Sequence, residues 1–71
     1  MTESETDTYI AGKIRANREV LGLSQVQLGE RLELSQQQVQ KIERGKAKVS
    51  AARLFEIAKI FGKPIAEFYP R

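Results

Sequence analysis

The chain of 71 residues contains no cysteine and no histidine. Without cysteine it can form neither a disulfide nor a thiolate zinc site, and without histidine it lacks the commonest acid or base of enzymes. A chain of this length folds as one small domain, whose core is marginal without such reinforcement. Its stability must therefore come from well-capped helices, with dimerisation as a further source.

Long apolar runs are also missing, since no segment approaches the length that spans a membrane. The first residues are acidic and polar, whereas a secretory signal is basic and then apolar. We therefore expect a cytoplasmic protein. Because no nucleophile with its base, no metal cluster and no phosphate-binding loop can be assembled from the sequence, we expect neither an enzyme nor a cofactor.

Basic residues outnumber acidic residues, and they are unevenly placed. Residues 1–7 contain three carboxylates and no base, which leaves residues 8–71 with 12 basic against 6 acidic side chains, a net charge of +6. Four of the bases fall within eight positions, namely Lys41, Arg44, Lys46 and Lys48. Such a cluster attracts a polyanion, although a solvated basic loop has the same composition.

The segment from Ser24 to Arg44 predicts two short helices separated by a tight turn. Ser24 and Ser35 are each followed three residues later by glutamine, a pattern in which the two side chains cap a helix start reciprocally. Apolar residues recur between them at helical spacing, so each helix has one buried stripe. Gly29 lies inside the first of these helices, and its missing side chain would let the two helices cross closely.

The outward face of the second of these helices is the predicted functional surface. With Val39 and Ile42 buried, the residues that face solvent are polar or basic: Gln36, Gln37, Gln40, Lys41 and Arg44. A glutamine amide can donate to and accept from the edge of adenine, while lysine and arginine suit guanine or phosphate. The pattern fits a helix in the major groove of DNA, and the simpler alternative is a solvated face rich in glutamine.

Further helices are predicted on either side of this pair. We expect an acidic disordered tail over residues 1–7, a first helix from about Thr8 to Leu21 capped by Thr6 or Asp7, a helix over residues 51–61 capped by Ser50, and a short last helix over residues 65–69. Arg18 falls on the buried stripe of the first helix. Glu43 is its expected partner in an ion pair that locks the first helix to the third; alternatively, both side chains reach water separately.

The last predicted helix and the end of the one before it are rich in large apolar residues. They carry more aromatic and apolar surface than so small a core needs. We therefore expect a dimer or partner surface formed by Phe61, Ile65, Phe68 and Tyr69.

The sequence closely resembles the XRE-type DNA-binding proteins, with the lambda-repressor-like fold of phage Cro and repressor domains. Three segments carry the resemblance: LGLSQ (21–25), LGERLELSQQQVQKIERGK (28–46) and RLFEIAKIFGKPIAEF (53–68). It implies an all-α, compact five-helix bundle over residues 8–71, whose third helix enters the major groove of double-stranded DNA. It also implies a homodimer on an inverted repeat, with half-sites about 34 Å apart.

The resemblance also assigns roles by position. Gln36, Gln37 and Lys41 match base-reading positions, and Arg18 with Glu43 matches a helix-locking ion pair. The positions that match phosphate contacts are Gln25, Arg44, Lys46 and Lys48, to which we add the outward-facing Gln40. Phosphate contacts position a protein on DNA, whereas base contacts specify the sequence.

Two positions depart from the family pattern. Glu33 stands where the turn between the second and third helices usually has glycine, so a left-handed residue there would carry a side chain at a cost of about 1 kcal/mol. The loop after Lys48 lacks the arginine that some phage members place in the minor groove. Reading of A·T-tract shape is therefore expected to be weak.

The sequence thus predicts a sequence-specific, dimeric transcriptional regulator, in particular a repressor. An alternative from another class is a protein-binding module such as an antitoxin, which would contact a partner through its last helix. Binding of single-stranded RNA is disfavoured, because that task relies on exposed stacking aromatics and the basic face has none.

Overall fold

In the computed structural model, which describes residues 1–70, four α-helices each begin at a serine or threonine cap. They are α1 (Glu3–Val20), α2 (Gln25–Leu32), α3 (Gln36–Glu43) and α4 (Ala51–Phe61), followed by the 3-10 helix η1 (Ile65–Phe68). At α2 and α3 the serine hydroxyl accepts from the backbone of a glutamine, whose side chain accepts from the backbone of the serine. Both predicted serine capping boxes are therefore confirmed.

α1 begins at Glu3, not at about Thr8, and its cap is Thr2 rather than Thr6 or Asp7. The Thr2 hydroxyl accepts from the Glu5 backbone N–H at 3.1 Å, and the Thr2 N–H donates to the Glu5 carboxylate at 3.0 Å. The hydrogen bond from the Thr2 backbone lowers the pKa of Glu5 below its ordinary value. Residues 3–7, expected to be a disordered tail, are therefore helical and place their carboxylates at the positive end of the helix dipole.

The last element is a 3-10 helix, so the described chain has four α-helices and one 3-10 turn rather than five α-helices. η1 starts after Pro64 without a side-chain cap, and its backbone bonds, such as that from Glu67 N to Pro64 O, span three residues. Only five residues separate Pro64 from Pro70. In a segment that short, too few hydrogen bonds form to offset the free-energy cost of nucleating an uncapped α-helix.

The turn between α2 and α3 requires glycine at position 29 for a reason other than the predicted close crossing of the two helices. Glu33 is left-handed (φ 58°), as expected, and it lets the chain fold back so that Leu34 N donates to Gly29 O at 2.8 Å. A Cβ on Gly29 would lie 2.5 Å from the Leu34 carbonyl oxygen and 3.4 Å from a Val39 methyl carbon. The glycine is therefore needed chiefly by the returning turn, and only secondarily by α3.

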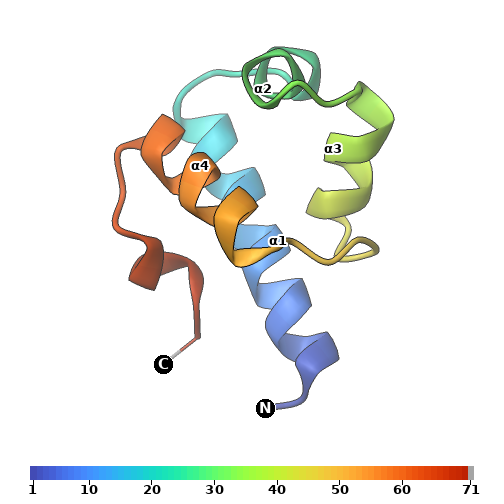
Figure 1. Cartoon of the computed structure of the whole chain (residues 1–71), viewed down its shortest axis with the longest axis vertical. Helices are drawn as coiled ribbons and strands as arrows, with labels where there is room; N and C mark the ends of the chain where they lie inside the picture. Colours follow the sequence, from blue (N-terminus) through green and yellow to red (C-terminus); the bar gives the residue numbers. More distant parts are fainter. Residues whose placement is uncertain (71) are drawn as a thin grey trace.

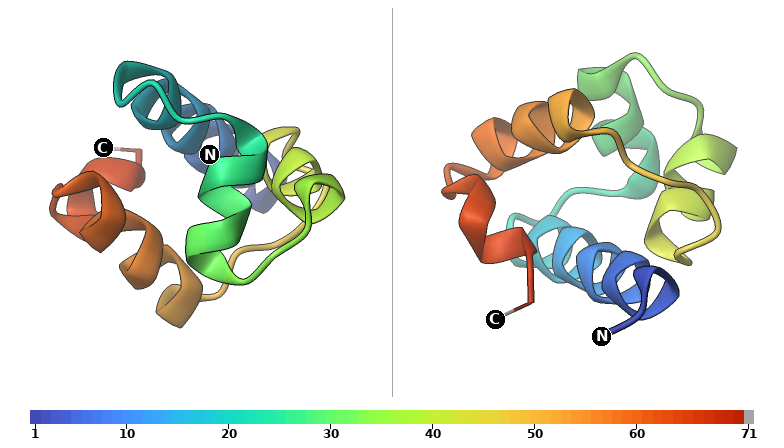
Figure 2. Two further views of the ribbon diagram at one scale, coloured as in Figure 1. Left: turned by 90° about the horizontal axis from the view of Figure 1, so that it is seen from above. Right: turned by 60° about the horizontal axis from the view of Figure 1, so that its bottom comes forward.

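The core lies among α1, α2, α3, α4 and η1, and α2 lies at one end of the molecule (Figure 1). Figure 2 shows the C-terminal segment turning back beside α1, while α3 lies on the opposite side of the fold. Eleven buried apolar residues form this core: Ile10, Ile14, Leu28, Leu32, Val39, Ile42, Leu54, Ile57, Ala58, Phe61 and Phe68. Within residues 1–70, every helix falls short of the length or the apolar character needed to cross a membrane.

Two of the four residues predicted as a dimer or partner surface are core residues instead. Phe61 is 7% exposed and Phe68 is fully buried, and their rings stack with centroids 6.2 Å apart. Because η1 packs against both α1 and α4, it buries the aromatic side chains that the sequence analysis judged too many for so small a core. Ile65 is half-buried against the same core, which leaves Tyr69, at 40% exposure, as the most accessible member of the set.

Candidate nucleic-acid interface

The first turns of α3 present an amide-rich surface to solvent. Gln36, Gln37 and Lys41 are exposed, whereas Val39 and Ile42 on the opposite side of the helix are buried. Hydrophobic anchoring therefore fixes which face of α3 points outward. An exposed glutamine amide keeps its donor and its acceptor free for a base edge, which is the chemistry that direct readout in the major groove requires.

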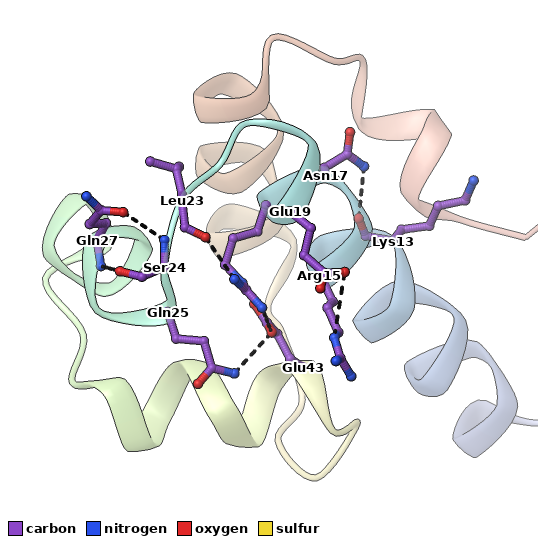
Figure 3. Close-up of polar contacts among 10 residues, drawn as sticks. Lys13, Arg15, Asn17, Glu19, Leu23, Ser24, Gln25, Gln27 and Glu43 are labelled. Carbon is purple, nitrogen blue, oxygen red and sulfur yellow. Dashed lines mark hydrogen bonds and ion pairs between the residues drawn. The ribbon is translucent and has the colours of Figure 1, made fainter.

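A polar network fixes the C-terminal end of α3 (Figure 3). Arg18 Nε donates to Glu43 Oε2 at 2.6 Å, and Arg18 Nη2 donates to Glu43 Oε1 at 3.0 Å. Arg18 Nη1 also donates to the Leu23 carbonyl at 2.8 Å. The hydrogen bonds that Arg18 donates to the Glu43 carboxylate raise the pKa of Arg18 above its ordinary value. The structure therefore brings together the two residues that the sequence paired.

Gln25 contributes to the same network, which the sequence did not predict. Its amide nitrogen donates to Glu43 Oε1 at 3.2 Å, so the start of α2 is linked to the end of α3. Gln25 is half-buried, and this bond orients its amide within the protein. One of the two side-chain N–H groups of Gln25 is therefore used within the protein, and the other remains to donate in the predicted phosphate contact.

The other candidate phosphate contacts surround α3 and the loop that follows it. Arg44, Lys46 and Lys48 are exposed, and Gln40 is half-buried. Gly45, with φ 70°, ends α3 and turns the chain so that the loop runs beside the helix. A shallow groove between α3 and the start of α4 adds Arg53 to this basic surface, next to Lys41 and Lys48.

Lys48 and Arg53 of this basic surface have partners within the chain, and Arg53 Nη1 donates to the Leu32 carbonyl at 3.0 Å. The partners of Lys48 are two carboxylates of α1. The Lys48 ammonium binds the carboxylates of Glu3 and Asp7, with 3.3 Å between Lys48 Nζ and Asp7 Oδ2. The hydrogen bond to Glu3, followed by that to Asp7, raises the pKa of Lys48. The sequence prediction missed these partners, although the Thr2 to Glu5 capping-box pattern indicates that the acidic residues belong to α1.

Residues 14–68 match the helix-turn-helix family. The chain belongs to this family. The match covers α2, α3 and the elements that hold them, and it confirms the resemblance to XRE-type proteins found in the sequence. α1 from Glu3 to Lys13, including the carboxylates that bind Lys48, lies before the matched part.

Relatives of this helix-turn-helix protein are named as transcriptional regulators. An uncharacterized HTH-type transcriptional regulator of Sinorhizobium medicae is 41% identical over 63 residues, which is 89% of this chain and 45% of the relative. An uncharacterized transcriptional regulator in the ATPase CF(0) region of Rhodospirillum rubrum is 40% identical, over 97% of this chain and 69% of the relative. The chain thus spans less than half the length of the first of these relatives.

Solved structures share the same helical fold. The DNA-binding domain of BldD is 32% identical with a TM-score of 0.84, and the similarity covers 97% of this chain and all of that domain. Hydroxypropylphosphonic acid epoxidase from S. wedmorenis is similar over 92% of this chain and 35% of its own, with a TM-score of 0.85. At 23% identity, the second similarity concerns the fold alone.

Proposed function

We propose that the protein is a sequence-specific transcriptional regulator that binds double-stranded DNA by inserting α3 into the major groove. The observation that carries the proposal is the division of α3 into two faces. Val39 and Ile42 anchor the helix in the core, and Gln36, Gln37 and Lys41 are exposed on the outer face. These three residues would read base edges.

The basic residues around α3 supply the second requirement of a DNA-binding surface. Arg44, Lys46 and Lys48 lie just beyond the C-terminal end of the reading face, where phosphates flank a helix in the major groove. Gln25 and Gln40 would add polar contacts to the backbone. Contacts of this kind fix position and orientation and make affinity depend on salt.

The size of the domain suits a homodimer on an inverted repeat. The domain measures 31 × 23 × 21 Å, so two copies can lie side by side with their α3 helices one DNA turn apart, about 34 Å. A dimer of this kind would act as a repressor where its operator overlaps a promoter. In bacteria such as those of its relatives, binding to DNA takes place in the cytoplasm.

The comparisons support this function at the level of class. The relatives from S. medicae and R. rubrum carry the name of transcriptional regulators, and the BldD domain is described as DNA-binding. The alternative of an antitoxin-like module has less support, because Phe61 and Phe68 of its predicted partner surface lie in the core. The DNA-binding function is therefore the one that the site favours.

Selection of duplexes from a random pool tests the proposal directly. We expect the protein to enrich a consensus with two-fold symmetry and half-site centres about 10 base pairs apart, or a multiple of that spacing. Sedimentation with the selected duplex should then give two chains per duplex. Failure to enrich any sequence would overturn sequence-specific binding, and enrichment of an asymmetric site by one chain would overturn the dimer.

A further inference from the structure

The N-terminal turns of α1 lie against the loop that joins α3 to α4. Lys48 in this loop binds Glu3 and Asp7, which are 45 and 41 residues away in sequence. The backbone approaches closely at the same place, because a Cβ on Gly45 would lie 3.5 Å from both Cα and Oγ1 of Thr8. Two independent contacts therefore dock the acidic start of α1 on the loop that follows the reading helix.

The docked carboxylates occupy a lysine that the proposed function needs. A carboxylate and a phosphate oxygen are both anionic hydrogen-bond acceptors, so Lys48 cannot satisfy both with the same N–H groups. We propose that the first two turns of α1 form an autoinhibitory contact, in which Glu3 and Asp7 compete with DNA phosphate for Lys48. The inference rests on the proposed DNA-binding function and adds to it a device that lowers affinity.

Accessibility makes the competition reversible. The side chain of Lys48 is 70% exposed and that of Glu3 is 76% exposed, so water and ions reach the pair and its two charges separate at little cost. Asp7, at 26% exposure, is held more firmly on the surface of α1. The acidic turns therefore weaken binding to DNA without abolishing it.

The contact also changes how binding responds to salt. When Lys48 moves from the carboxylates to a phosphate, DNA releases a counterion, but the freed carboxylates take one up. The net release is therefore smaller than for a lysine that starts unpaired. Because Lys48 would contact phosphate and not bases, operator and random DNA should be affected alike.

The test compares the full chain with its Glu3→Gln/Asp7→Asn variant on the selected operator and on random-sequence duplex over a range of salt concentrations. We expect both duplexes to bind the variant roughly twofold to fivefold more tightly, the upper part of the range for an exposed ion pair. The salt slope should steepen by up to about 1. Circular dichroism should show that α1 stays helical, since both side chains lie on its surface.

A matched control removes the same charge elsewhere. Glu30→Gln/Glu67→Gln deletes two exposed carboxylates, on α2 and η1, that do not contact Lys48. We expect this control to tighten binding much less. In a Lys48→Gln background, the Glu3→Gln/Asp7→Asn change should give no more gain than the control pair.

Each other outcome would overturn the inference. An equal gain from both charge-deleting pairs would mean that only net charge matters, and a loss of affinity on removing Glu3 and Asp7 would mean that they hold the loop ready for DNA. An unchanged affinity would mean that the contact has no effect on binding. Failure of every variant to bind any duplex would overturn the proposed function together with the inference, and is thereby distinguishable from the other results.

Discussion

Arg18 and Glu43 lie 25 residues apart in the sequence and share two hydrogen bonds, of 2.6 and 3.0 Å. Their side chains are only 11% and 3% exposed. Because Arg18 also binds the Leu23 carbonyl, one guanidinium joins α1, the turn after it and the end of α3. The pair thereby fixes the orientation of α3 relative to α1, and with it the direction in which the exposed glutamines of α3 point.

Replacing Arg18 by Met should destabilise the protein strongly. The change keeps an apolar stem but leaves the Glu43 carboxylate buried with only Gln25 as a polar partner, at a cost of roughly 3 kcal/mol. Thermal unfolding should show a melting temperature lower by at least about 12 °C. The double variant Arg18→Met/Glu43→Met should recover much of the loss, because it removes both charges. Additive effects of the two single changes would show that the pair is not coupled.

Gly29→Ala and Gly12→Ala should change stability in opposite directions. Both glycines lie inside helices, where alanine gains about 1 kcal/mol of helix propensity. Nothing lies within 4 Å of a Cβ on Gly12, whereas a Cβ on Gly29 would meet the Leu34 carbonyl oxygen at 2.5 Å. We expect Gly12→Ala to stabilise by about 1 kcal/mol and Gly29→Ala to destabilise by roughly 1–3 kcal/mol in urea unfolding. A similar gain from both would disprove the close approach of the turn.

Glu33→Gly should stabilise the turn between α2 and α3. Glu33 has φ 58° and ψ 41°, a conformation that glycine adopts without the clash of a Cβ. We expect a gain of about 1 kcal/mol in the free energy of unfolding. Glu33→Ala is the control, since it removes the same carboxylate but keeps the Cβ. If alanine stabilised as much as glycine, the gain would come from charge and not from the backbone.

Local signals accounted for most of the fold. The caps at Ser24, Ser35 and Ser50 depend on residues three positions apart, and each helix start that they predicted is present. Thr2 carries the same signal with Glu5, so the true start of α1 could also have been predicted. The sequence prediction of a later start therefore assigned residues 3–7 to a disordered tail, although they are helical.

Contacts between distant residues were harder to predict. The Arg18 and Glu43 pair followed from one rule, that a charge on a buried stripe needs a partner. Nothing comparable links Lys48 to Glu3, because both are exposed and many exposed charges have no partner. The burial of Phe68 depends on how far η1 folds back over α1 and α4, which the spacing of apolar residues does not specify.

Replacing Gln36 and Gln37 by alanine should reduce discrimination and leave stability intact. Both side chains are exposed, so the free energy of unfolding should change by no more than about 0.5 kcal/mol. Each amide that pairs with a base is worth roughly 1–3 kcal/mol of preference for the correct base. Competition between operator and random duplex should therefore show at least about a tenfold loss of preference. An unchanged preference would mean that neither residue reads bases.

Lys46→Ala should weaken binding to every duplex by a similar factor. Lys46 is exposed in the loop after α3, where a lysine would contact phosphate rather than a base. Loss of one phosphate contact should flatten the plot of log affinity against log salt by about 1. Lys63→Ala is the control, because it removes the same charge between α4 and η1, on the side of the fold away from α3 (Figure 1). An altered preference among sequences would instead mean that Lys46 touches bases, and an equal effect of Lys63→Ala would mean that net charge alone is responsible.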